Sequence, residues 1–200
     1  RIYSHSRVIA MLFLGFSAGL PFLLVFSTLS AWLADLDVTR TAIGFFGWIG
    51  LTYSIKVLWA PVVDRLVLPW GKRLGQRRSW ILLGQCGIAL GLVGMGLTDP
   101  VENLPVVALL ALLVAFSSAT QDVAVDAYRI EAVITDYQGA MSATYVFGYK
   151  VALLVAGAGA LFIADFGGWT LAYLSMAAFM AVGMVTVLLI GEPERGLPEA

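Results

Sequence analysis

Six long apolar segments constrain what this chain can fold into more than any other feature. They cover residues 8–33, 42–63, 79–97, 105–128, 139–164 and 169–190, and short connectors separate them. A helix needs about 20 apolar residues to cross roughly 30 Å of hydrocarbon, so each segment is long enough to span a bilayer. The chain is 60% hydrophobic and only 12% charged, whereas soluble domains are about 25% charged. We therefore predict an all-α, multi-pass membrane protein.

Composition also excludes several classes of function. The net charge is -1, which leaves no basic excess for a nucleic-acid partner. The one cysteine, Cys86, lies inside an apolar segment and can build neither a disulfide framework nor a cysteine metal site. Because the sequence also contains no zinc-binding or phosphate-binding motif, we expect no metal and no organic cofactor.

The two ends of the sequence indicate whether a segment is removed and whether the chain is part of a longer protein. The first apolar segment is longer than the hydrophobic region of a secretory signal and lacks a clear small-residue cleavage site, so we expect it to stay in the membrane. The chain begins at Arg1 rather than Met and stops soon after its last apolar segment. We therefore expect it to be part of a longer protein.

The distribution of positive charge predicts the orientation in the membrane. Of the 12 Lys and Arg residues, only Arg40 lies in a connector on one side. The tails and connectors of the other side carry Arg1, Arg7, Arg65, Lys72, Arg73, Arg77, Arg78, Arg129 and Arg195. Since positively charged loops are retained in the cytoplasm, we expect both ends of this segment to be cytoplasmic.

Four ionisable side chains remain at membrane depth. They are Lys56 in the second segment, Asp122 and Asp126 in the fourth, and Lys150 in the fifth. Each costs about 2.5 to 3.5 kcal/mol near the bilayer centre, and such groups usually mark a substrate or proton pathway. This favours a functional role for Asp122, Lys56 and Lys150. For Asp126 the alternative of a helix end emerging into water stays open, and for Asp122 so does a structural ion pair with a lysine.

These charges share helix faces with other polar residues. At about 100° per residue, Ser118, Asp122 and Asp126 lie on one face of their helix. The same spacing places polar residues of the second and fifth segments on common faces, so we predict a polar cavity between the three helices. The residues predicted to line it are Tyr53, Lys56, Ser118, Gln121, Tyr145, Tyr149 and Lys150.

The chemistry of this set favours proton coupling and an anionic substrate. Burial favours the neutral form of a carboxylate and a nearby cation favours the ionised form, so a carboxylate beside a lysine can exchange a proton. We predict that Asp122 and Asp126 couple transport to protons, the only coupling ion expected. Lysines supply point charges for a substrate carboxylate, and tyrosines supply stacking surfaces with a polar hydroxyl.

The stretch "GFSAG", Gly15 to Gly19, raises the alternative of an intramembrane protease. It matches the pattern G-x-S-x-G, which needs a preceding strand and a nearby base. Here it lies inside an apolar helical segment, and the only histidine, His5, precedes that segment. Close helix packing explains the glycines better.

The basic connector "VVDRLVLPWGKRLGQRR" is more informative. It carries Asp64 and Arg65 near its start and Arg77 and Arg78 at its end. This pattern resembles the loop between helices two and three of the major facilitator superfamily, although this connector is longer and Ala60-Pro61 precedes it instead of a glycine. We predict that the four charged residues form a conformational loop.

Other stretches resemble one group within that superfamily. "LGFSAGLPFLLVFSTLSAWL", "IGFFGWIGLTYSIKVLWAPVVDR", "LGQRRSWIL" and "SATQDVAVDAYRIE" together are similar to the AmpG family of bacterial muropeptide permeases and related acetyl-coenzyme A transporters. The resemblance covers essentially the whole chain. Its most specific part is "SATQDVAVDAYR", because general sugar porters lack two aspartates there.

The resemblance implies both a fold and an activity. The fold is the N-terminal half, over residues 1–200, of a twelve-helix transporter, with helices one to three and four to six related as an inverted repeat. The expected partners are membrane lipid, a C-terminal six-helix half and a small-molecule muropeptide. The activity is proton-coupled import of anhydro-muropeptides across the bacterial inner membrane, which recycles cell wall and can feed β-lactamase induction, a route to antibiotic resistance.

The resemblance also assigns roles to residues. Asp122 and Asp126 match proposed proton-coupling carboxylates, while Lys56 and Lys150 match positions facing the cavity. Two alternatives stay open. One is a carrier of another anionic substrate such as acetyl-coenzyme A, and the other is a non-transporting six-helix scaffold or protease.

Overall fold

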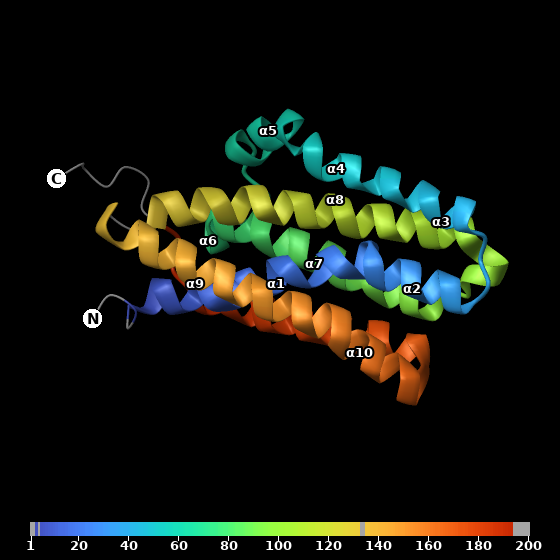
Figure 1. Cartoon of the computed structure of the whole chain (residues 1–200). Helices are drawn as coiled ribbons and strands as arrows, with labels where there is room; N and C mark the ends of the chain where they lie inside the picture. Colours follow the sequence, from blue (N-terminus) through green and yellow to red (C-terminus); the bar gives the residue numbers. More distant parts are fainter. Residues whose placement is uncertain (1–2, 4, 133–134, 194–200) are drawn as a thin grey trace.

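The computed structural model describes residues 3, 5–132 and 135–193, which form a bundle of long helices with no strand among them (Figure 1). Within these residues, five helical stretches are long and apolar enough to cross a membrane: Ser6–Asp35, Arg40–Leu58, Gln76–Leu97, Pro100–Ala132 and Asp136–Leu189. The last has 54 residues and contains the predicted segment 139–164 and all but the final residue of the segment 169–190. The prediction of an all-helical, multi-pass membrane protein is confirmed.

The first span consists of α1 (Ser6–Val25) and α2 (Ser27–Asp35) rather than one uninterrupted helix. Phe26 interrupts it with φ -110° and ψ -94°, and its N–H bonds to the carbonyl of Leu23 instead of continuing the regular ladder. α1 packs along α9 (Thr135–Leu154). A Cβ on Gly15 would collide with the backbone of Tyr145. This agrees with helix packing as the reason for the glycines of "GFSAG".

The second span is broken into short turns. It contains α3 (Arg40–Phe46), η2 (Gly47–Gly50), α4 (Leu51–Ser54), η3 (Lys56–Leu58) and α5 (Ala60–Arg65), where one helix over 42–63 was expected. Glycine weakens a helix and proline lacks an N–H donor, and this span holds Gly44, Gly47, Gly50 and Pro61. The other helices also bury little of this span: 17% of its apolar stretch is buried, against 67% for the first span.

The next two spans form an antiparallel pair. A short helix, α6 (Gly71–Leu74), leads through Gly75 into α7 (Gln76–Leu97), and α8 (Pro100–Ala132) returns along it. The backbone of α8 is irregular at Asn103. A Cβ on Gly84 would lie 2.9 Å from the carbonyl oxygen of Ser117, so the small residues of α7 allow close contact with α8.

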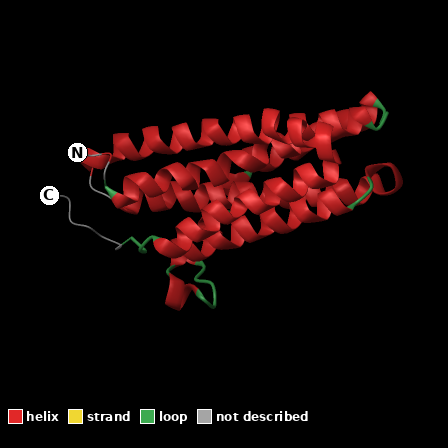
Figure 2. Ribbon diagram, turned by 90° about the horizontal axis from the view of Figure 1, so that it is seen from below, coloured by secondary structure: helices red, strands yellow, loops and turns green. Residues whose placement is uncertain are grey.

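The last stretch turns back on itself. α9 continues through a π-helical turn, η4 (Val155–Gly159), into α10 (Ala160–Leu189). Gly168, with φ 80° and ψ 165°, breaks α10 in a backbone region that is essentially restricted to glycine. The chain reverses there, and the remainder of α10 packs along α7 and α1 (Figures 1 and 2).

The ends of several helices meet at one end of the bundle. The guanidinium of Arg7 donates to the carbonyl of Ala132, and Arg78 Nε donates to the carbonyl of Val187 at 2.8 Å. The starts of α1 and α7 therefore lie beside the ends of α8 and α10 (Figure 1). Arg1 and Arg195 lie outside the described residues, and the cytoplasmic location of this end stays a prediction.

Candidate functional site

An ion pair between two spans lies at the centre of the candidate site. Lys56 Nζ, on η3, lies 3.7 Å from Asp122 Oδ2 on α8, and the two side chains are 32% and 20% exposed. The broken second span places Lys56 there. Trp59 in the next turn donates its indole N–H to Thr120 Oγ1 at 3.2 Å, and its ring packs on Phe116.

Tyrosines from two further elements lie near Asp122. Tyr53 comes from α4, with its hydroxyl beside Ser118, and Tyr145 and Tyr149 come from α9. The rings of Tyr145 and Tyr149 lie 6.3 Å apart. We call the group of Tyr53, Lys56, Ser118, Asp122, Tyr145 and Tyr149 the Asp122 cluster. It brings together most of the predicted cavity residues.

Asp122 is incompletely partnered. Its Oδ2 faces Lys56, while its Oδ1 is buried and has no hydrogen-bond partner among the described residues. A charged pair beyond about 3.5 Å without further donors gains less than a close hydrogen-bonded pair. We call this pair loose because it lacks the close hydrogen bonds that would fix its geometry, and loss of the charge on Asp122 would release Lys56.

Three predicted residues lie apart from this cluster. Asp126 Oδ1 pairs with Arg129 Nη2 at 3.2 Å on its own helix, and the Asp126 side chain is half exposed. Lys150 is exposed on α9 and makes no ion pair with the described residues. Gln121 is fully buried and points toward α1.

Gln121 belongs to an uncharged polar group in the core. Its Nε2 donates to Ser17 Oγ at 3.1 Å, and Gln85 Nε2 donates to the same oxygen at 3.2 Å. The side-chain carbonyl oxygens of both glutamines are buried without a partner in the described part of the chain. Ser17, Gln85 and Gln121 thus link α1, α7 and α8 beside the Asp122 cluster.

A second, tighter charge cluster lies at the end of the bundle where Arg7 and Arg78 bond the ends of α8 and α10. We call this end the basic end. Arg77 Nη1 lies 2.6 Å from Asp64 Oδ1, and Arg77 Nη2 lies 2.6 Å from Glu131 Oε1. Arg77 Nε also donates to both carboxylate oxygens of Glu131. The side chain of Arg77 is only 8% exposed. We call these three residues the Arg77 cluster.

The other two members of the predicted conformational loop lie elsewhere. Arg78 donates to carbonyls of Leu74, Val187 and Leu188, which fastens α7 to the end of α10. Arg65 is exposed. The backbone amides of Arg77 and Arg78 donate to the carboxylate of Glu192.

Sequence reasoning missed Glu131 and Glu192 as partners of this loop. Glu131, near the end of α8, was not among the predicted site residues, but it bonds Arg77. A signal was available, because the end of the fourth segment and the loop of Arg77 were predicted on the same membrane side. Among the described residues, no three His, Cys, Asp or Glu side chains form a group that could hold a metal ion.

Comparison with known proteins identifies the class. The family model described as Major Facilitator Superfamily matches residues 8–200. The chain therefore belongs to the Major Facilitator Superfamily, a family of transporters rather than enzymes.

Individual relatives show which group within the superfamily this chain is similar to. The chain is 37% identical over 199 residues to the anhydromuropeptide permease of Escherichia coli K12, covering 99% of this chain and 40% of that protein. It is 36% identical over 196 residues to a Rickettsia felis protein named AmpG 4, covering 97% and 47%. For AmpG 3 of Rickettsia prowazekii the identity is 32% over 197 residues, covering 96% and 46%. The resemblance to AmpG is confirmed, and the chain spans less than half the length of these relatives.

Proposed function

We propose that this chain is the N-terminal half of a proton-coupled importer of anhydro-muropeptides in a bacterial inner membrane. The substrate class rests on the similarity to the E. coli anhydromuropeptide permease. The coupling rests on one observation, the loose pair of Lys56 and Asp122 inside the bundle. Both ends of the segment would face the cytoplasm, as the clustered basic residues favour.

In this proposal Asp122 is the group that carries the proton. When a carboxylate oxygen of Asp122 binds a proton, the negative charge disappears and Lys56 loses its counter-ion. The ammonium of Lys56 is then available for a carboxylate of the substrate peptide. When Asp122 returns the proton on the cytoplasmic side, it competes for Lys56 again and displaces that carboxylate. Proton and substrate therefore move in the same direction.

The surrounding residues have supporting roles in the proposal. Tyr53, Tyr145 and Tyr149 offer rings and hydroxyls to the sugar and peptide parts of the substrate. Asp126, which lies four residues after Asp122 on α8, is the second candidate carboxylate for the coupling step. Lys150, exposed next to Tyr149, contacts a second substrate carboxylate. The Arg77 cluster holds α5, α7 and α8 together while the cavity opens first to one side of the membrane and then to the other.

Uptake of labelled anhydro-muropeptide by the full-length protein tests the proposal, in cells whose own muropeptide uptake has been removed. We expect accumulation that collapses when the proton gradient is dissipated and that unlabelled muropeptide blocks. Asp122→Asn should abolish accumulation, whereas Asp165→Asn, at an exposed position on α10, should not. Lys150→Ala should weaken uptake of a charged muropeptide.

Three results would contradict parts of this account. Accumulation that survives loss of the proton gradient excludes proton coupling. Equal competition by acetyl-coenzyme A would favour a carrier of other anionic substrates. Unchanged uptake of a charged muropeptide by Lys150→Ala would exclude Lys150 as a partner of the substrate carboxylate.

A further inference from the structure

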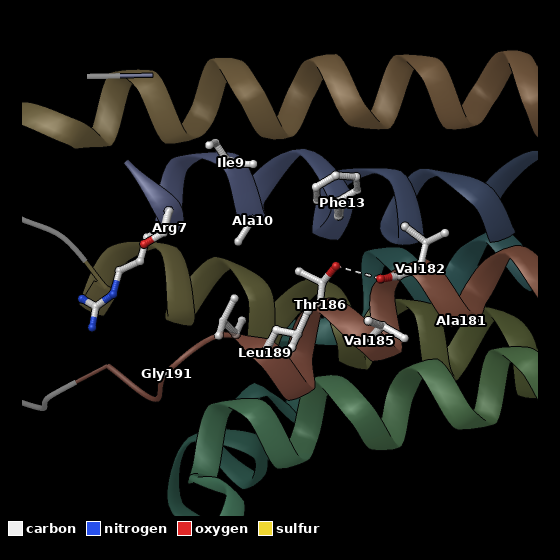
Figure 3. Close-up of a pocket in the computed structure, with 12 residues that line it drawn as sticks. Arg7, Ile9, Ala10, Phe13, Ala181, Val182, Val185, Thr186, Leu189 and Gly191 are labelled. Atoms are coloured by element: carbon white, nitrogen blue, oxygen red, sulfur yellow. Dashed lines mark hydrogen bonds between the residues drawn. The ribbon is translucent and has the colours of Figure 1, made fainter. Parts of the chain in front are cut away.

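An apolar groove runs between the start of α1 and the end of α10, away from the Asp122 cluster. Its volume is about 700 Å³. Figure 3 shows Ile9, Ala10 and Phe13 of α1 along one side of this groove and Val182, Val185 and Leu189 of α10 along the other. The remaining residues that line it are Ser6, Arg7, Ala181, Thr186, Ile190 and Gly191.

The groove lies beside a close contact between the two helices. A Cβ on Gly183 of α10 would collide with the side chain of Ser17 of α1, so the helices are in close contact there. The residues of α1 that line the groove all precede Ser17. Between this contact and the basic end of the bundle, Val185 and Leu189 are 52% and 81% exposed. These side chains are exposed on the surface of the bundle.

The mouth of the groove carries a positive charge. Arg7 lies at this end of the groove (Figure 3). Its guanidinium has five N–H donors, and the described residues take one of them, through the carbonyl of Ala132. Glu192, which follows the groove residue Gly191, accepts hydrogen bonds from the backbone amides of Arg77 and Arg78 instead. Arg7 therefore makes no ion pair with the described residues, and its charge is available at the groove.

We propose that this groove binds an anionic phospholipid, with an acyl chain along the apolar walls and the phosphate against Arg7. A basic residue at the mouth of a groove between membrane helices has the charge and the depth that lipid headgroups require. The apolar length between Arg7 and Phe13 suits hydrocarbon and offers nothing to a polar substrate. The proposal depends on the membrane location of the chain and not on the proposed transport.

Lipid binding to the purified full-length protein tests this site. Native mass spectrometry would follow titration with phosphatidylglycerol and, separately, with phosphatidylcholine. We expect phosphatidylglycerol to bind more tightly to the wild type. Arg7→Gln should weaken phosphatidylglycerol about fivefold, since one basic residue near the surface contributes about that factor. It should weaken phosphatidylcholine less, because the choline of that lipid already offsets the charge of its phosphate. Val185→Trp, which fills the groove from an exposed position, should weaken both lipids.

Two matched variants serve as controls. Arg73→Gln removes an exposed charge at the same end, and Leu188→Trp adds the same bulk to α10 at a position outside the groove. Neither should change the binding of either lipid. Equal binding of the two lipids by the wild type would overturn the proposal. Equal phosphatidylglycerol binding by Arg7→Gln and Arg73→Gln would also overturn it. An absence of lipid binding, because another segment of the full chain fills the groove, would overturn it as well.

Discussion

The Asp122 cluster and the Arg77 cluster both place carboxylates against a cation, yet they are built differently. In the Arg77 cluster two carboxylates lie 2.6 Å from one guanidinium that is almost fully buried. In the Asp122 cluster the charged atoms lie 3.7 Å apart, and one buried carboxylate oxygen has no partner among the described residues. Close, bidentate pairs fix a geometry, whereas a single longer contact constrains the two side chains less. The comparison separates a group that fastens helices from a group suited to exchange.

Among these variants, removal of Arg77 should cause the largest loss of stability, and it tests whether the Arg77 cluster fastens the helices. Arg77→Ala leaves Asp64 and Glu131 without their shared cation. A fully buried pair broken this way costs about 3–5 kcal/mol; because both carboxylates are partly exposed, we expect a loss of about 2–3 kcal/mol. Thermal unfolding of the full-length protein in detergent measures it. A change no larger than that of Arg73→Ala, the exposed control, would show that the cluster does not stabilise the fold.

Removing Lys56 should affect transport rather than stability. Lys56→Met keeps the length of the side chain but removes the charge that holds Asp122 and, in our proposal, the substrate carboxylate. A charged hydrogen bond contributes about 1.5–3 kcal/mol, so muropeptide uptake should fall at least about tenfold. The unfolding temperature should change less than for Arg77→Ala. Normal uptake with a large loss of stability would reverse the two roles.

The uncharged group of Ser17, Gln85 and Gln121 offers a reference without ions. Ser17→Ala removes the hydroxyl that accepts from both glutamines. Hydrogen bonds between membrane helices contribute about 0.6 kcal/mol each, so we expect a loss of about 1 kcal/mol and little pH dependence of stability. Thermal unfolding at two pH values checks this. A loss that depends strongly on pH would mean that the group is coupled to a titrating residue.

Asp126 should show the smallest effect. Its partner Arg129 lies on the same helix and its side chain is half exposed, so loss of the pair costs at most about 1 kcal/mol. Asp126→Asn should lower uptake about two- to fivefold, well short of Asp122→Asn. Equal losses for both variants, measured in one uptake assay, would make Asp126 an equal member of the coupling site.

The sequence predicted the helical class and much of the Asp122 cluster for an identifiable physical reason. Apolar length reveals a membrane span whether its helix is regular or broken, so the interruption at Phe26 and the short turns of residues 40–65 left the spans recognisable. Tyr53 and Lys56 are three residues apart, a spacing that shares a face in both α-helical and tighter turns. Their prediction therefore did not depend on a regular helix.

Other features depend on neighbours that periodicity does not reveal. Gln121 is adjacent to Asp122 in sequence, but about 100° around the helix it meets Ser17 of α1 instead. Helical periodicity gives the direction of a side chain and not the helix opposite it. Glu131 was missed for the same reason, since its partner Arg77 comes from a distant part of the sequence.

Proton movement during transport tests the central claim most directly. The full-length protein would be reconstituted in liposomes that contain a pH-sensitive dye, and muropeptide would be added outside without an imposed gradient. We predict that the wild type acidifies the lumen as substrate enters. Asp122→Asn should exchange labelled for unlabelled muropeptide while moving no protons. Acidification by Asp122→Asn at the wild-type rate would contradict the assignment of Asp122 as the coupling group.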